Sequence, residues 1–113
     1  MLGIGAGHRE HTREYVREYV KPYDAVVSYL DELDAAVIPT SRRVLAALGP
    51  RMLRLAAQRS AGAHPFLTAP EHTAKARELV GGSVFLAPAH KVVLTTDRDR
   101  ARAAGRPSST TWA

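Results

Sequence analysis

The chain has 113 residues, of which 45% are hydrophobic and 24% charged, and its formal net charge is +5. This length fits one domain or a piece of a larger one, and the composition is typical of a soluble globular protein. No apolar run approaches the roughly 18 residues of a membrane-spanning helix, and the first residues lack a signal-peptide pattern. We therefore expect a cytoplasmic protein with no membrane contact. The absence of cysteine excludes disulfides, thiolate metal sites and cysteine nucleophiles.

The charge is unevenly distributed along the chain. Residues 1–34 contain 4 basic and 7 acidic residues, whereas residues 35–113 contain 12 basic and 4 acidic residues. A basic second half is compatible with a nucleic-acid or phosphate partner, but arginine-rich helix faces in solvent are the commoner cause. Charge patterning alone therefore favours solvated helix faces.

The first part of the chain predicts one strand and two helices. Residues 2–5 (LGIG) indicate a strand that ends in a glycine-rich turn, and residues 13–20 (REYVREYV) indicate a helix capped by Thr12. A second helix is expected over residues 22–36, because proline is tolerated in the first turn of a helix. Its expected buried stripe consists of Val26, Val27, Leu30 and Leu33.

From residue 43 onward, short apolar runs alternate with amphipathic segments. Strands are expected over residues 43–49, 62–67 and either 84–87 or 92–94, and helices over residues 50–60, 68–82 and 97–104. The predicted helix ends are a capping box of Thr68 and Glu71, a glycine stop at Gly81 and Gly82, a cap by Thr96 and a stop at Gly105.

This alternation predicts an α/β fold with a parallel sheet. About four strand-then-helix units follow one another with short connections, so each helix must return the chain across the sheet. Continuous apolar runs such as VLAAL suit strands that are buried on both faces. The candidates are a small doubly wound fold and part of a (β/α)8 barrel, which needs about 250 residues when complete.

Two glycine-containing segments follow predicted strands, where both architectures place their ligands. Gly49 permits close backbone approach, Pro50 fixes the first helical residue, and the amides of Arg51, Met52 and Leu53 are expected to point outward. A cation at Arg51 opposes the helix dipole by about 0.3 to 1 kcal/mol, and a bound phosphate would reverse that cost. A solvent-facing Arg51 beside a plain turn is the alternative. The segment GIGAGH offers a second such loop, with a flexible turn as its alternative.

Two of the histidines are candidates for the ligand edge. His90 would border it if the neighbouring strand is short, and otherwise lies in a loop. His64 follows a predicted strand and could act as a general acid or hydrogen-bond donor, although a structural histidine is the commoner case. His72 is expected in solvent. His8 and His11 lack a third ligand of clear spacing, so no metal site is predicted. Because no catalytic triad or carboxylate pair emerges, an enzyme of this kind would rely on a bound cofactor.

The run RVLAALGPRMLRLAAQRSAGAHPFLTAPEHTAKARELVGG, followed by FLAPAHKVVLTTD, resembles the middle of the luciferase-like monooxygenase family. More specifically, it resembles the branch of oxidoreductases that depend on the deazaflavin coenzyme F420. The resemblance covers about residues 2–104 and implies strands four to seven of a (β/α)8 TIM barrel. It also implies hydride transfer between the deazaflavin and a small organic substrate.

The resemblance implies cofactor-binding positions but no catalytic residue. Backbone groups after family strand five contact the phosphate-bearing side chain of the coenzyme, and the glycine loop after strand four does so more loosely. His64 would line the cavity. The implied cofactor-binding residues in this chain are Gly5, Ala6, Gly7, Ala47, Leu48, Gly49, Pro50 and Arg51.

Family strands one to three and everything after the seventh helix have no counterpart in this sequence. We therefore expect residues 1–104 to be a barrel fragment that is inactive alone, followed by a disordered tail over residues 105–113. A half-barrel exposes two strand edges, which predicts self-association through them.

Two other functions are kept as alternatives. The first keeps the family but replaces coenzyme F420 with FMN, as in its flavin monooxygenase branch. The second is a small basic nucleic-acid-binding protein that uses Arg51, Arg54, Arg59 and the DRDRAR helix. The low aromatic content and the lack of a known binding module make that second alternative the weaker one.

Overall fold

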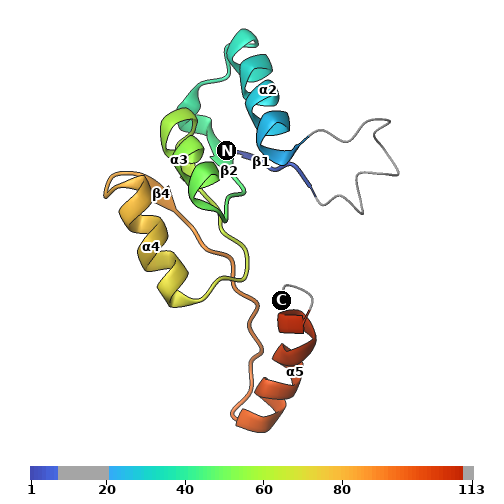
Figure 1. The fold of residues 1–113 in the computed structure, drawn as a ribbon. Coiled ribbons are helices and arrows are strands. Elements are labelled where there is room, and N and C mark those ends of the chain that lie inside the picture. Colours follow the sequence, from blue (N-terminus) through green and yellow to red (C-terminus); the bar gives the residue numbers. More distant parts are fainter. Residues whose placement is uncertain (8–20, 111–113) are drawn as a thin grey trace.

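Four short parallel strands alternate with helices in the computed structural model, which describes residues 1–7 and 21–110 (Figure 1). The predicted helix over residues 13–20, with Thr12, His8 and His11, lies outside these ranges. In chain order the elements are β1 (Leu2–Ile4), α2 (Pro22–Ala35), a 3-10 helix (Thr40–Arg42), β2 (Arg43–Leu45), α3 (Pro50–Arg59), β3 (Gly62–Ala63), α4 (Pro70–Val80), β4 (Phe85–Leu86) and α5 (Arg98–Thr110).

Proline begins three of these helices, as the sequence predicts. Pro22, Pro50 and Pro70 each occupy a first-turn position, where the missing N–H has no intrahelical acceptor to satisfy. Gly81 ends α4 with a φ of 89°, a backbone conformation that glycine adopts without strain. The apolar run at residues 84–87 supplies β4, whereas Val92 and Leu94 are exposed and form no strand.

Three predicted helix ends are wrong. Because α4 begins at Pro70, Ala69 is its N-cap, and the Thr68 hydroxyl lies one residue too early to cap it. Asp97, not Thr96, caps α5, since its Oδ1 accepts from the amides of Asp99 and Arg100. The same helix continues through Gly105 to Thr110, because glycine weakens a helix without forbidding it.

The sheet runs in the order β1-β2-β3-β4, and each neighbouring pair is parallel. The α/β class and the parallel sheet are therefore confirmed. A doubly wound sheet needs a point at which the strand order reverses, and the described strands contain none. The edge strands are β1 and β4, and self-association through them stays a prediction.

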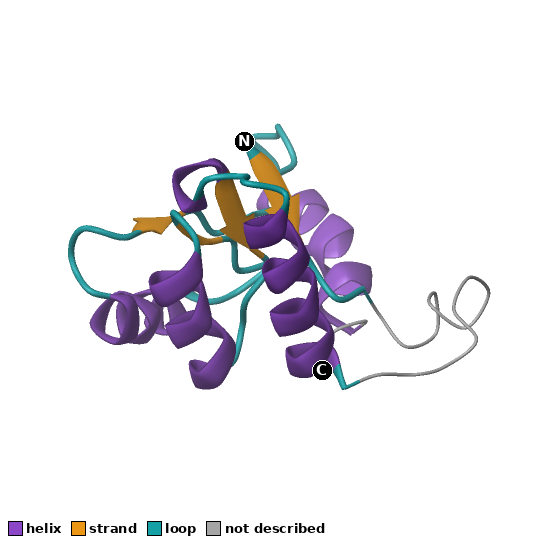
Figure 2. Ribbon diagram, turned by 90° about the horizontal axis from the view of Figure 1, so that it is seen from above, coloured by secondary structure: helices purple, strands orange, loops and turns teal. Residues whose placement is uncertain are grey.

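One face of the sheet packs on the helices. Ile4, Leu45 and Ala63 are in register and belong to a buried cluster that also takes residues from α2, α3 and α4. Figure 2 shows these helices gathered on one side of the strands. The cluster includes Val26, Leu30 and Leu33 from the predicted stripe of α2, with Val27 partly buried against it.

The opposite face carries a second row in register. Gly3, Val44, Gly62 and Phe85 form this row, and none of them belongs to the helix-side cluster. Gly62 is required here, because a Cβ at that position would lie 1.9 Å from the carbonyl oxygen of Phe85. Phe85 itself is 49% exposed, so the described residues leave part of this face open.

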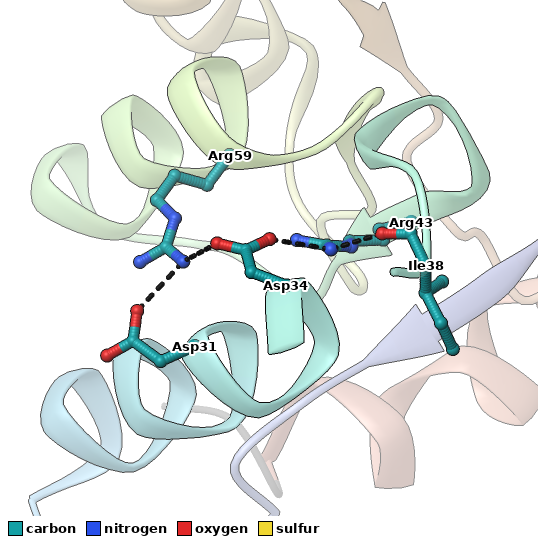
Figure 3. A network of polar contacts seen from close by, with 5 residues as sticks. All are labelled: Asp31, Asp34, Ile38, Arg43 and Arg59. Carbon is teal, nitrogen blue, oxygen red and sulfur yellow. Dashed lines mark hydrogen bonds and ion pairs between the residues drawn. The ribbon is translucent and has the colours of Figure 1, made fainter. Parts of the chain in front are cut away.

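An ionic network holds the amino end of β2 (Figure 3). The Arg43 side chain, only 1% exposed, lies 2.7 Å from Asp34 Oδ1 and donates to the carbonyl of Ile38. Arg59 from α3 reaches Asp31 at 2.9 Å and Asp34 at 2.6 Å. Hydrogen bonds from Arg43 and then Arg59 lower the pKa of the Asp34 carboxyl below its ordinary value.

The last helix lies apart from the other described helices. Figure 1 shows α5 at the end of a long connection from β4, away from α2 and β1. Across the part of the chain that the structure describes, no helix combines the length and apolar character needed to cross a membrane.

Candidate functional site

The predicted binding segments meet at the carboxyl edge of the sheet. Parallel strands end at the same edge, so Gly5 after β1, Ala46 after β2 and His64 after β3 are neighbours in the sheet. Backbone hydrogen bonds continue the ladder past the strands: Ala46 N donates to Ile4 O at 2.7 Å and His64 N to Leu45 O at 2.8 Å. The site is therefore built on the sheet rather than on distant loops.

The turn after β2 leads directly into α3. Gly49 is the N-cap in an extended conformation, and no side chain caps the helix. The Leu53 amide donates to Gly49 O at 3.0 Å, so the predicted outward amide at Leu53 is wrong. The amides of Arg51 and Met52 precede the first intrahelical bond and face the edge, as helix geometry requires.

Arg51 has a partner that the sequence does not reveal. Its guanidinium carbon lies 3.8 Å from the centroid of the Tyr23 ring, in the first turn of α2. Such a contact stabilises an exposed cation by about 0.5 to 1 kcal/mol. The ring therefore offsets the unfavourable helix dipole at Arg51 without any ligand.

The neighbours of Gly49 are divided between core and surface. Ala47 is 3% exposed and packs in the helix-side core, so only its backbone can meet a ligand. Leu48 is 46% exposed, and its carbonyl accepts from His72 Nε2 at 2.7 Å. The expectation that His72 lies in solvent is wrong, because it is partly buried and ties α4 to this turn.

The glycine loop after β1 is tightly placed. A Cβ on Gly5 would lie 3.2 Å from the Cβ of Ala46, so the two loops touch at this point. Ala6 is partly buried against the core cluster, and Gly7 has a φ of 70°. The close approach and the positive φ explain the glycines without a ligand, yet they also bring the backbone of this loop beside the turn after β2.

His64 lies on the same edge with one ring nitrogen fixed. Its Nδ1 is 2.6 Å from the Ala87 carbonyl, which can only accept, so Nδ1 carries the proton and donates. In the neutral ring Nε2 is then an acceptor. His64 lines a cavity of about 380 Å³ on the open face of the sheet, together with Gly5, Ala46 and Phe85.

The arginines expected to form a nucleic-acid surface are used elsewhere or dispersed. Arg59 pairs with Asp31 and Asp34, and Arg51 lies on Tyr23, while Arg98 lies on the separate helix α5. Among residues 1–7 and 21–110, no group of three or more histidine, aspartate or glutamate side chains is placed to hold a metal ion.

Sequence reasoning missed Tyr23, His72 and Ala87 as partners of the site. Each contact joins elements that are distant in sequence, and no motif marks it. The only available signal is positional, because Tyr23 and His72 both lie in the first turn of a helix that begins with proline. Helices that follow parallel strands start near the carboxyl edge, so such residues are candidates for contacts there.

Comparison of the chain with protein-family models, curated proteins and solved structures finds no match. The resemblance to luciferase-like oxidoreductases therefore stays a prediction. Any function assigned to the chain depends on the geometry of its carboxyl edge.

Proposed function

We propose that this chain forms part of a (β/α)8 barrel oxidoreductase that binds the deazaflavin coenzyme F420 at the carboxyl edge of its sheet. The reaction would transfer hydride between the deazaflavin and a small organic substrate. One observation carries the proposal: the glycine loop after β1, the uncapped turn into α3 and His64 lie along the same edge.

The strand order supports a barrel unit. Strands that follow one another without reversal, with helices packed on one face, are the repeating unit of a barrel wall. The opposite face carries Gly3, Val44 and Phe85 and would become the barrel interior. Parallel sheets are normally covered on both faces, so further strands closing the barrel would account for the exposed part of this one.

The turn into α3 fits a phosphate group. The amides of Arg51 and Met52 have no side-chain cap, and the position of a Cβ on Gly49 is open space with no atom within 4 Å. Helix N-termini of this kind bind anions through their amides and dipole. Arg51, held by Tyr23 beside this turn, would add a positive charge to the same group.

The deazaflavin ring, when bound, supplies the hydride chemistry at its C5 atom. The chain positions the coenzyme by holding its phosphate at Gly49, Pro50 and Arg51, with the backbone of Leu48 fixed by the hydrogen bond from His72. His64 places one acceptor nitrogen, Nε2, in the mostly apolar cavity on the open face of the sheet. We assign no catalytic residue.

The proposal is tested by fluorescence titration of the full chain with coenzyme F420. Arg51→Glu places a negative charge beside the expected phosphate, and we expect a loss of affinity of roughly tenfold or more. Arg54→Glu is the matched control, since it makes the same charge change on the exposed surface of α3 outside its first turn. We expect it to leave binding within about twofold.

A parallel titration with FMN separates the two branches of the family. Tighter binding of FMN than of coenzyme F420 would mean that the cofactor of this site is a flavin and not the deazaflavin. No binding of either compound at millimolar concentration would overturn it. Equal losses in Arg51→Glu and Arg54→Glu would show that the turn into α3 is not the binding site.

A further inference from the structure

A second cavity lies beside the loops that follow β3 and β4, away from the turn after β2. Its volume is about 630 Å³, within the range of small-molecule sites. The proposed function does not use it. It is lined by Leu67, Thr68, Ala69, His90, Lys91, Val92, Val93, Ala101, Ala104 and Gly105.

The floor of this cavity is held by backbone hydrogen bonds. Leu67 N donates to Ala89 O at 3.0 Å, and Ala89 N donates to Pro65 O at 2.8 Å. Leu67 has a φ of 53°, which is uncommon for a residue with a large side chain. The loops after β3 and β4 are thus tied together, and backbone of this unfavourable kind is often found at functional sites.

One wall is the small-residue face of α5. Ala101, Ala104 and Gly105 line the cavity from this helix. The start of α5 is fixed by the carboxylate of Asp97, which accepts from the amides of Asp99 and Arg100 at 2.9 and 3.1 Å. Short side chains on a capped helix leave room between α5 and the loops after β3 and β4.

The polar groups of the cavity favour a negatively charged ligand. Thr68 Oγ1 is buried and has no hydrogen-bond partner among the described residues, so it offers a donor at the cavity wall. His90 and Lys91 are adjacent basic residues, and none of the ten lining residues is a carboxylate. The remaining lining side chains, including Leu67, Val92 and Val93, are apolar.

We propose that this cavity binds an organic anion with an apolar body, of the class of medium-chain carboxylates. The carboxylate would be held by Lys91 and His90, with the Thr68 hydroxyl as a further donor. The alkyl chain would lie against Leu67, Val92 and the alanines of α5. The site is independent of the coenzyme site, because the two share no residue.

The test is a titration of the isotope-labelled full chain with octanoate, followed through backbone amide shifts in NMR spectra. We expect saturable shifts at Thr68, Lys91 and Ala104. Octanol, which has the same alkyl chain without the charge, should bind about tenfold more weakly, because a charge-assisted hydrogen bond is lost. Lys91→Gln should reduce octanoate affinity by a similar factor, whereas Lys75→Gln, on the exposed surface of α4, should not.

A second variant tests the cavity rather than the charge. Ala104→Trp places a large ring into the space between α5 and the loops, and the exposure of Ala104 makes the change compatible with folding. We expect it to abolish the octanoate shifts while binding of coenzyme F420 is unchanged. Loss of both would indicate misfolding, which the amide spectrum of the variant reveals directly.

Three results would overturn the inference. The first is equal affinity for octanoate and octanol, and the second is octanoate shifts confined to the open sheet face around Gly3 and Phe85. The third is unaltered binding in both Lys91→Gln and Ala104→Trp. Failure of coenzyme F420 to bind leaves these outcomes unaffected, so this inference and the proposed function fail separately.

Discussion

Two arginines flank β2, and they are held in opposite ways. Arg43 starts the strand at the amino edge and is 1% exposed, with Asp34 and the Ile38 carbonyl as partners. Arg51 follows the strand at the carboxyl edge and is exposed, with the face of the Tyr23 ring beside it. The sheet therefore has one edge locked by charged contacts and one edge that presents backbone and charge to the outside.

The two edges of the sheet differ because different ends of the helices lie beside them. At the amino edge the ends of α2 and α3 approach β2, and Asp34 accepts from arginines on both of the other elements. At the carboxyl edge the helices begin, so their first amides lack intrahelical acceptors. In α/β folds of the barrel type, this separates the stabilising edge from the ligand-binding edge.

The largest expected effect is at Arg43. Arg43→Ala removes a long buried side chain and leaves a void at the start of β2, which we expect to lower the free energy of unfolding by about 3 kcal/mol. Urea denaturation followed by circular dichroism measures this. The neighbouring exposed Arg42→Ala should change stability by no more than about 0.5 kcal/mol.

A second variant at position 43 separates packing from charge. Among the described residues, Arg43 Nε and Nη1 have no hydrogen-bond partner, so burying these two donors costs free energy. Arg43→Met retains much of the volume without the charge, and we expect it to recover most of the stability lost in Arg43→Ala. A loss in Arg43→Met as large as in Arg43→Ala would mean that the ionic contacts, not the packing, stabilise the edge.

The next effect compares two glycines. Gly62→Ala forces a Cβ against the backbone of Phe85, so we expect a loss of about 2 to 3 kcal/mol from overpacking between β3 and β4. Gly49→Ala meets open space at a φ of −80°, but alanine is a poorer N-cap than glycine, which opposes the gain in backbone entropy, so we expect a net change within about 0.5 kcal/mol. Thermal unfolding of both variants gives the comparison, and a loss in Gly49→Ala as large as in Gly62→Ala would contradict it.

The Gly49 variant also bears on the carboxyl edge as a binding site. If a phosphate docks against the backbone there, the added methyl group should weaken coenzyme binding even though the stability of the protein is nearly unchanged. Unchanged affinity in a folded Gly49→Ala would argue that the ligand stays further from the turn.

The amino edge should also be sensitive to acid. The pKa of Asp34 is lowered from its ordinary value of 3.8 by its hydrogen bonds to Arg43 and Arg59, so folding favours the deprotonated form. Its contribution is fully present above pH 3.8 and is lost as the pH falls below that value through the folded pKa. The urea midpoint should therefore drop in this window.

The matched variants identify the group responsible. Asp34→Asn should show a lower urea midpoint at neutral pH and a shallower decrease as the pH falls below 3.8. Glu78→Gln, an exposed change on α4, should follow the unmodified chain. Identical acid profiles for all three proteins would mean that Asp34 is not responsible for the loss of stability in acid.

Much of the fold could be predicted from the sequence, because its signals are local. Prolines 22, 50 and 70 mark helix starts, and short apolar runs mark the strands between them. Strand lengths could not be predicted: in VLAAL the strand ends at Leu45, although the apolar run continues into the turn. Hydrophobicity reports burial, and Ala47 is buried in the core without being in a strand.

The burial of Arg43 shows a different limit. An Arg-Arg pair gives no indication of which side chain is buried, and composition favours exposure of both. The choice is made by register, since Arg43 shares a face with Leu45 while Arg42 lies in the preceding 3-10 helix. The burial of Arg43 is therefore determined by the register and packing of the sheet.

The candidate site was predictable in its position but not in its contacts. Strand polarity alone places the loops after β1, β2 and β3 at the same edge. The contacts of Arg51 with Tyr23 and of His72 with Leu48 depend on how neighbouring helices pack, which periodicity does not encode. These two contacts are therefore the part of the site that only the structure supplies.

The smallest expected effect on stability is at Arg51. This effect shows whether Tyr23 holds Arg51 at the carboxyl edge. Arg51→Ala loses a cation–π contact of about 0.5 to 1 kcal/mol and removes a helix-dipole penalty of about 0.3 to 1 kcal/mol. The two nearly cancel, so stability should change by less than about 0.5 kcal/mol. Tyr23→Leu loses the cation–π contact but keeps the helix-dipole penalty at Arg51, so it should lower the stability more than Arg51→Ala does.

A double-mutant cycle of Arg51→Ala and Tyr23→Leu measures the coupling directly, and we expect about 0.5 to 1 kcal/mol. A coupling of that size, together with weak coenzyme binding in either single variant, would show that Tyr23 holds Arg51 in place for the ligand. Zero coupling would mean that the ring does not hold Arg51. The helix-dipole penalty at Arg51 would then be either offset by a bound anion or left uncompensated in solvent, and the coenzyme titration of Arg51→Glu separates these two cases.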